Sequence, residues 1–535
     1  MGVGWRTWSR TLAGIGIAAG VLLGIAVQAA TPPNMLVMGT RLDDIITLDP
    51  AEVFEFSGAE VTANIYDRIT MYEPENLTEL VGGVVESWEI ADDGKVITFK
   101  MRPGLTFHSG NPVRPEDAVY SLRRVVKLNK TPSFIVTQFG WTPENVDELV
   151  RVVDDEHFQI EITEDFSPGL VLNALSAGVG SVVDELEVEA HAVDDDMGYG
   201  WLKNNSAGSG AFKLVSWNAN ESVVLEHNPD YRHGAPAMER VILRHVPEPA
   251  AQRLLLEQGD IDIARTLTPD QVKGLAGNAD LVLENFPKAT LLYVAANASV
   301  PELSDPKVWE ALKYLIDYDG MATSFLEGQY IPHQSFWGSG LWASADAKPY
   351  TLDVEKGKAL LAEAGYPDGF SMTIDSLNTS PYMEMAESIQ STFADAGITA
   401  EIVPQDGSAL WPKYRARRHQ LILARWGPDY LDPHSNADSF ASNPDNSPEA
   451  GLTGVLAWRN AWDDPEITAM TAAARSELDL DKRKALYEEL QLRHQTNSPF
   501  AVIVQQNEQV VGRAGVEGFV SGPSFDLVFY RNVTK

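Results

Sequence analysis

From residue 290 onwards, strand-like apolar runs alternate with amphipathic helical segments, and no other feature constrains the fold as strongly. A strand is expected at 291–294, and Asp305-Pro306 is a typical cap and first turn for the helix that follows. Two further helices are expected, over 353–365 and around 383–397, before a strand at 398–403. Because alternating strands and helices build sheets covered by helices, this half of the chain predicts an α/β fold.

The N-terminal half has hairpin and helix signals of its own. Asp93-Gly94 separates two strand-like runs at 86–90 and 96–101, which indicates a hairpin because glycine tolerates the positive φ of the turn. A helix is expected to begin at Pro115, where acidic residues suit the positive end of its dipole. At 535 residues the chain exceeds one ordinary core, so two or three domains are expected.

Residues 1–30 have the pattern of a cleaved export signal. Arg6 and Arg10 supply a positive start, an uncharged apolar run covers 11–27, and Ala29-Ala30 end a small-residue cleavage site. The alternative is an uncleaved membrane anchor, but the run is short, rich in glycine and followed by prolines. With no cysteine to carry a lipid, the mature chain is expected to be freely soluble in the periplasm.

Charge and composition exclude several classes of partner and chemistry. A net charge of −35 argues against nucleic acid and anionic membranes, because both require basic patches. The same acidity mildly favours cationic or zwitterionic ligands. The absence of cysteine excludes disulfides, thiolate metal sites and cysteine nucleophiles.

The stretch from Leu421 to Pro433 is the strongest candidate for a binding site. A strand-length apolar run leads into a turn that carries Arg425, Trp426, Asp429 and Tyr430. A carboxylate flanked by aromatic rings suits an ammonium group, since the charges pair and the rings add cation–π attraction. The alternative is that Arg425 and Asp429 pair with each other and the aromatic residues belong to the core.

Sequence motifs for catalysis are absent from the chain. It contains no His-Glu-x-x-His, no P-loop and no Gly-x-Ser-x-Gly elbow, and its ten histidines are scattered. Ser209 lies between glycines, but a glycine turn entering a strand explains it better than a nucleophile for which no base can be named. We therefore expect no enzyme activity, no cofactor and no metal site.

A dense group of motifs at 86–121, with shorter ones after it, carries a resemblance over essentially the whole mature chain. The motifs are Glu86-Ser87-Trp88-Glu89, Asp93-Gly94, Thr98-Phe99-Lys100-Met101-Arg102-Pro103-Gly104, Pro115-Glu116-Asp117-Ala118, Gly208-Ser209-Gly210-Ala211-Phe212, Asn228-Pro229-Asp230-Tyr231, Gly259-Asp260-Ile261-Asp262 and Ala364-Gly365-Tyr366-Pro367. Together they resemble the family 5 extracellular solute-binding proteins of dipeptide, oligopeptide and nickel ABC importers. The segments 205–210, 316–321 and 426–433 look most like its dipeptide and D,D-dipeptide branch. Arg114 departs from the family, which usually has a small polar helix cap there.

The resemblance implies a fold and a division of the chain. The expected fold is α/β: a two-lobed periplasmic-binding-protein fold of type II, in the peptide-binding class with an extra subdomain and a hinge between the lobes. The first lobe would combine 31–68, 205–290 and 506–535, with the extra subdomain at 69–204. The second lobe would cover 291–505.

The resemblance also implies roles for particular residues. In peptide binders of this type, the aspartate of the Trp-x-x-Asp-Tyr segment holds the α-ammonium of the peptide, and Asp429 occupies that position. The strand through Trp426 and Gly427 would hydrogen-bond the peptide backbone, and the segment 54–57 would face it from the other lobe. The predicted ligand-binding residues are Asp429, Trp426, Gly427, Arg425, Tyr430, Phe56, Ser57 and Trp411.

A carboxylate on the ligand would need a guanidinium group. Arg425 is the nearest candidate, and Arg415, Arg417 and Arg418 on the preceding element are its rivals. The sequence leaves this choice open.

The expected function is that of a monomeric periplasmic receptor, which captures a dipeptide or short peptide and delivers it to an ABC permease in the inner membrane. Because a ligand that bridges two lobes favours the closed form, closure would be the state that the permease recognises. The alternatives are the same receptor role for an opine, an oligosaccharide or a metal chelate, and more remotely an exported hydrolase.

Overall fold

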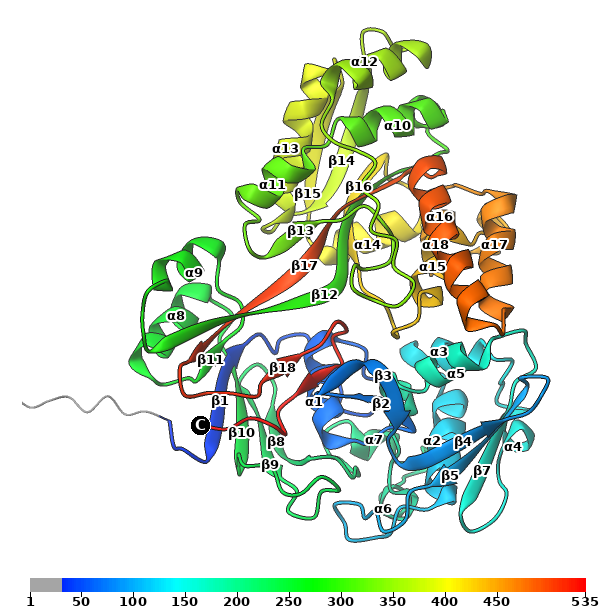
Figure 1. The fold of residues 1–535 in the computed structure, drawn as a ribbon, viewed down its shortest axis with the longest axis vertical. Helices are drawn as coiled ribbons and strands as arrows, with labels where there is room; N and C mark the ends of the chain where they lie inside the picture. Colours follow the sequence, from blue (N-terminus) through cyan, green and yellow to red (C-terminus); the bar gives the residue numbers. More distant parts are fainter. Residues whose placement is uncertain (1–30) are drawn as a thin grey trace, which may run out of the picture.

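The computed structural model describes residues 31–535, which form two lobes joined by a pair of long strands (Figure 1). These are β12 (Leu281–Ala296) and β17 (Phe500–Arg513), which pair antiparallel and run from one lobe into the other. Their register shifts between Pro287 and Leu291, a bulge that bends the pair between the lobes. We call the lobe whose core extends from Leu291 to Val504 the second lobe, and the other the first lobe. The predicted export signal lies outside the described residues.

One mixed sheet of eleven strands passes through both lobes by way of the hinge strands. Its order is β15-β14-β16-β12-β17-β11-β1-β10-β9-β8, with β13 beside β17. The second-lobe strands are β13 (Tyr330–Pro332), β14 (Ser371–Leu377), β15 (Thr399–Gln405) and β16 (Leu421–Trp426). The first-lobe strands are β1 (Met35–Thr40), β8 (Phe212–Asn218), β9 (Ser222–His227), β10 (Arg240–His245) and β11 (Ile263–Ala264).

Helices cover the second-lobe part of the sheet, as the alternating pattern predicted. They are α10 (Pro306–Tyr314), α11 (Tyr318–Thr323), α12 (Val354–Glu363), α13 (Tyr382–Asp395), α14 (Gly407–Arg415), α15 (His434–Ala441), α16 (Leu456–Arg459), α17 (Pro465–Ser476) and α18 (Leu480–Asn497). The Asp305 carboxylate caps α10, accepting from the Lys307 N–H at 2.8 Å. None of the helices within 31–535 is long and apolar enough to cross a bilayer.

The first lobe holds a second sheet with a core of its own. Strands β4 (Val85–Ile90), β5 (Val96–Met101), β7 (His157–Glu161) and β6 (Val150–Val152) pair antiparallel in that order. The predicted Asp93-Gly94 hairpin joins β4 to β5, with Gly94 at φ 72°. Helix α2 (Pro115–Leu128) begins at the predicted proline. The backbone N–H of Arg114 donates to the Asp117 carboxylate at 2.8 Å, so the unusual cap residue still closes the helix end.

The rest of the first lobe consists of short elements around these sheets. The hairpin strands are β2 (Thr70–Glu73) with β3 (Asn76–Gly82), and β18 (Val520–Ser521) with β19 (Val528–Phe529). The helices are α1 (Phe56–Ile65), α3 (Phe134–Thr137), α4 (Val146–Leu149), α5 (Pro168–Ala174), α6 (Glu185–Ala190), α7 (Tyr199–Leu202), α8 (Pro249–Gln258) and α9 (Pro269–Leu275).

The two lobes also touch away from the hinge, at the right of Figure 1, where α17 approaches α5. The guanidinium of Arg475 lies 4.7 Å from the ring centroid of Phe166, and its Nε donates to the Asp165 carbonyl at 3.1 Å. The Ser167 N–H donates to the Arg475 carbonyl at 2.9 Å. We call these contacts of Arg475 with residues 165–167 the rim clasp. They show that the structure is a form in which the lobes have come together.

Candidate ligand-binding site

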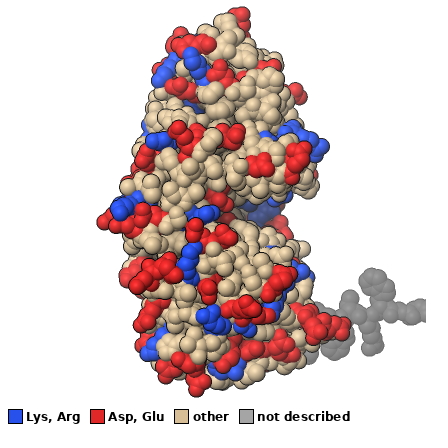
Figure 2. Space-filling view, turned by 90° about the vertical axis from the view of Figure 1, so that its right-hand side faces the viewer, with Lys and Arg blue, Asp and Glu red and all other residues tan. Residues whose placement is uncertain are grey.

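A cavity of about 680 Å³ lies between the lobes, beside the hinge strands. In the space-filling view an indentation separates the upper and lower lobes, and acidic side chains are spread over the visible face (Figure 2). The first lobe contributes the segments 40–44 and 54–60 with Arg265, and the C-terminal segment contributes Phe525. Lys288, Thr290 and Arg425 approach from the hinge and the second lobe. The volume is sufficient for a small ligand.

Three of the predicted binding residues line this cavity: Phe56, Ser57 and Arg425. The guanidinium of Arg425 lies 5.1 Å from the centroid of the Phe56 ring, which stacks at 4.8 Å on Phe525. Phe525 was not predicted, because nothing in a lone aromatic residue near the C-terminus indicates a binding role. Together these groups form an aromatic wall beside a cation.

Asp429 lies in an adjoining, much smaller cavity of about 10 Å³, on the other side of Phe54 and Phe525. Its backbone N–H donates to Ser435 Oγ at 2.8 Å, which fixes the loop that follows β16. The carboxylate is partly buried and makes no ion pair with any residue of 31–535. Burial, together with the charges of Asp526 and Asp438, raises the pKa of Asp429 to about 7.

The alternative interpretation of this stretch, an ion pair between Arg425 and Asp429, is not what the structure contains. Arg425 projects into the cavity and interacts with Phe56 and the Tyr382 hydroxyl. Within residues 31–535 it makes no ion pair. Among its rivals, Arg417 donates to the Asn446 carbonyl at 2.8 Å and lies over Trp458, while Arg415 and Arg418 are exposed. Of these four arginines, the described structure places Arg425 in the cavity.

Trp426, Gly427, Tyr430 and Trp411 line neither of the two cavities. The Trp426 indole donates to Asn436 Oδ1 at 3.1 Å, and Gly427 approaches Thr290, which lines the large cavity. Tyr430 is buried in the core of the first-lobe subdomain, so its ring helps to join the lobes. Trp411, on α14, packs partly buried against the second-lobe core.

A buried charge network at the base of the cavity was not predicted. Arg265 pairs with Glu60 at 2.5 Å and with Glu508 at 2.6 Å, and Lys288 lies 3.7 Å from Glu508. Burial alone would favour the neutral acid, but Arg265 and then Lys288 outweigh it and lower the pKa of Glu508 to about 2. The network connects α1 to both hinge strands. Its members are far apart in the sequence, and no local pattern could have indicated it.

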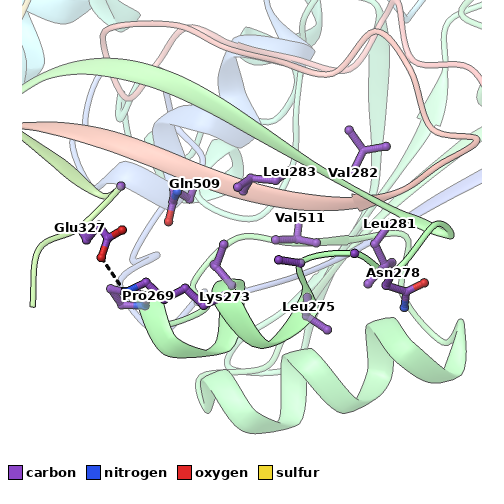
Figure 3. Close-up of a pocket in the computed structure, with 14 residues that line it drawn as sticks. Pro269, Lys273, Leu275, Asn278, Leu281, Val282, Leu283, Glu327, Gln509 and Val511 are labelled. Carbon is purple, nitrogen blue, oxygen red and sulfur yellow. Dashed lines mark hydrogen bonds and ion pairs between the residues drawn. The ribbon is translucent and has the colours of Figure 1, made fainter. Parts of the chain in front are cut away.

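A second groove, of about 300 Å³, lies beside the hinge strands, between them and α9 (Figure 3). Its wall is mostly apolar and includes Leu275, Val282 and Leu283. An ion pair of 2.6 Å between Lys273 and Glu327 closes one end. No predicted ligand-binding residue lines this groove.

Comparison with known proteins identifies the class that this fold and cleft define. Residues 79–448 match the family model described as bacterial extracellular solute-binding proteins, family 5 Middle, and the chain belongs to this family. The sequence resemblance is thereby confirmed.

Individual relatives are similar over nearly the whole chain. The probable D,D-dipeptide-binding periplasmic protein DdpA of Escherichia coli K12 is 27% identical over 509 residues, covering 94% of this chain and 95% of that protein. The dipeptide-binding protein of the same organism is 24% identical, covering 86% and 87%. The structure of DppA from Helicobacter pylori in complex with the peptide STSA has a TM-score of 0.77 at 23% identity, covering 94% and 98%. This likeness confirms the two-lobed fold.

Proposed function

We propose that this protein is a periplasmic receptor of an ABC importer, which binds a dipeptide or short peptide between its lobes and delivers it to the membrane permease. The observation that carries the proposal is the Asp429 carboxylate, which is partly buried where the lobes meet and has no cationic partner within residues 31–535. A desolvated carboxylate is costly unless it pairs, and a ligand ammonium would supply the partner. Relatives named for dipeptide binding support the same ligand class.

The ligand would be held at both ends. Asp429 would pair with its α-ammonium, and Arg425 in the large cavity would pair with its carboxylate. The hydroxyl of Thr290, which lies beside Gly427 and lines the large cavity, would hydrogen-bond the peptide backbone. For this arrangement the two cavities must communicate, which requires movement of the Phe54 and Phe525 rings that lie between them. We assign 31–68, 205–290 and 506–535 to the first lobe, 69–204 to its extra subdomain and 291–505 to the second lobe.

Thermal unfolding with candidate ligands tests the proposal. A ligand that binds the folded state adds RT ln(1 + [L]/Kd), so dipeptides at about 100 times Kd are expected to stabilise the protein by about 2.7 kcal/mol. Cello- and galacto-oligosaccharides and opines are expected to leave the melting temperature unchanged. A response to a sugar or an opine but to no peptide would contradict the peptide assignment while leaving the receptor role intact.

The rim clasp is expected to set how easily the cleft closes. Replacing Arg475 with alanine removes its contacts with Phe166 and Asp165, which lie outside both cavities. A loss of about 1 kcal/mol from the closed form would weaken the apparent peptide affinity about fivefold, because affinity scales with the fraction of closed molecules. Isothermal titration and small-angle scattering would measure both effects.

Arg493→Ala is the matched control for this variant, because Arg493 is exposed on α18 and its ion pairs, with Glu489 at 2.9 Å and with Glu466 of α17 at 3.6 Å, stay within the second lobe. It is expected to leave both affinity and shape unchanged. If Arg475→Ala and the unmodified protein bind peptide with equal affinity, the rim clasp does not affect the closure equilibrium.

A further inference from the structure

We propose that the cleft selects peptides that carry a basic side chain, and that Asp44 is the carboxylate which receives this second positive charge. The inference rests on the proposed function, and it names a ligand class within it. It follows from which charged residues of the large cavity form ion pairs with each other and which do not.

Five carboxylates and four cations line the large cavity. Most of them neutralise each other within the protein. Glu60 and Glu508 are paired with Arg265 and Lys288, as described above. Asp43 is paired with Arg41 at 3.0 Å. The remaining charges are Asp44, Glu55 and Arg425, so two carboxylates face one guanidinium group.

Asp44 is the less satisfied of the two remaining carboxylates. One of its oxygens accepts from the Ser57 N–H at 3.1 Å, while Oδ1 is buried and accepts no hydrogen bond from residues 31–535. Arg41 acts on Asp44 from a distance, but its short contact is with Asp43. Glu55 lies at the N-terminus of α1, where the helix dipole already favours a negative charge. A ligand cation would therefore stabilise the carboxylate of Asp44 more than that of Glu55.

A simple zwitterionic dipeptide would bring no cation to Asp44. Its ammonium would pair with Asp429 and its carboxylate with Arg425, and Asp44 would stay without a partner. A lysine or arginine side chain would bring the missing charge, whereas an acidic side chain would meet like charge. Complementary potentials across an interface favour the matching ligand and penalise the wrong one. We expect a preference of about tenfold for a basic over a neutral dipeptide, which corresponds to about 1.4 kcal/mol.

Titration calorimetry with Ala-Ala, Ala-Lys, Lys-Ala and Ala-Glu tests the inference. The basic peptides are expected to bind about tenfold tighter than Ala-Ala, and Ala-Glu is expected to bind more weakly than Ala-Ala. Asp44→Asn should reduce the ratio of basic-peptide affinity to Ala-Ala affinity to about twofold or less. Glu55→Gln should reduce the preference less. The matched control is Glu449→Gln, since Glu449 is an exposed acid of the second lobe outside the cavity.

The outcomes separate the inference from the proposed function. If Ala-Ala binds as tightly as the basic peptides, or if the preference survives in Asp44→Asn, the inference is overturned and peptide binding stands. If no peptide binds at all, both fail. If Asp44→Asn does not fold, the preference of the unmodified protein must still weaken as salt is raised from 50 mM to 500 mM, and an unchanged preference would overturn the inference.

Discussion

Asp429→Asn is expected to raise the stability of the ligand-free protein and to abolish its response to peptides. The carboxylate is partly buried between the lobes, repelled by Asp526 and Asp438, and without an ion-pair partner among residues 31–535. Removing its charge should stabilise the free protein by roughly 2 kcal/mol, given a pKa near 7 and a partly solvated site. The ligand ammonium would lose its counter-charge, which should weaken peptide binding at least a hundredfold.

The stabilisation should depend on pH in a defined direction. The pKa of Asp429 in the folded protein, about 7, lies above that of an unfolded aspartate, so the folded state binds the extra proton between these two values. The free energy cost of the charge is therefore fully present above pH 7 and disappears as the pH falls towards 4. The advantage of Asp429→Asn over the unmodified protein should shrink over the same range. Peptide affinity of the unmodified protein should also fall below pH 7, because binding requires the carboxylate.

Asp438→Asn is the matched control for this variant. Asp438 is exposed and contributes to the repulsion at Asp429, yet it lines neither cavity. Its replacement should retain peptide binding and move the pH dependence to slightly lower pH. A full peptide response in Asp429→Asn would show that the ammonium is bound elsewhere.

Arg483→Met is expected to destabilise the protein by about 3–5 kcal/mol, the usual cost of leaving one member of a buried ion pair uncompensated. Arg483 on α18 forms two hydrogen bonds with the Asp432 carboxylate, at 2.7 and 2.8 Å, and both side chains are almost fully buried. Asp432 also accepts from the His434 N–H at 2.9 Å. The pair therefore anchors the loop that carries Asp429 to the last helix of the second lobe. Denaturant unfolding followed by circular dichroism would measure the loss.

A double variant distinguishes loss of the pair from loss of packing. In Asp432→Asn with Arg483→Met no charge is left buried, so the double variant should be more stable than Arg483→Met alone. Arg493→Ala, on an exposed face of the same helix, should cost less than about 1 kcal/mol. A loss for Arg483→Met no larger than that of the control would contradict the anchoring role.

Local sequence patterns were sufficient to predict these secondary-structure elements and the class of protein. The Asp93-Gly94 turn, the helix beginning at Pro115 and the alternation after residue 290 depend on neighbours a few positions away, and each is present in the structure. The motifs at 86–121 identified the family without any tertiary information. The roles of the predicted ligand-binding residues remain predictions, although the structure places Phe56, Ser57 and Arg425 in one cavity.

The sequence by itself determined the secondary structure, the family and the loop in which Asp429 lies, because those depend on short-range spacing and on motifs. Only the tertiary structure decided which charges are neutralised and which are left for a ligand. Phe525 is near the C-terminus, Arg483 follows Asp432 by about fifty residues, and Arg265 meets Glu60 and Glu508 across the fold. The free energy of a charge depends on its burial and on its nearest opposite charge, and both are set when distant segments and two lobes come together.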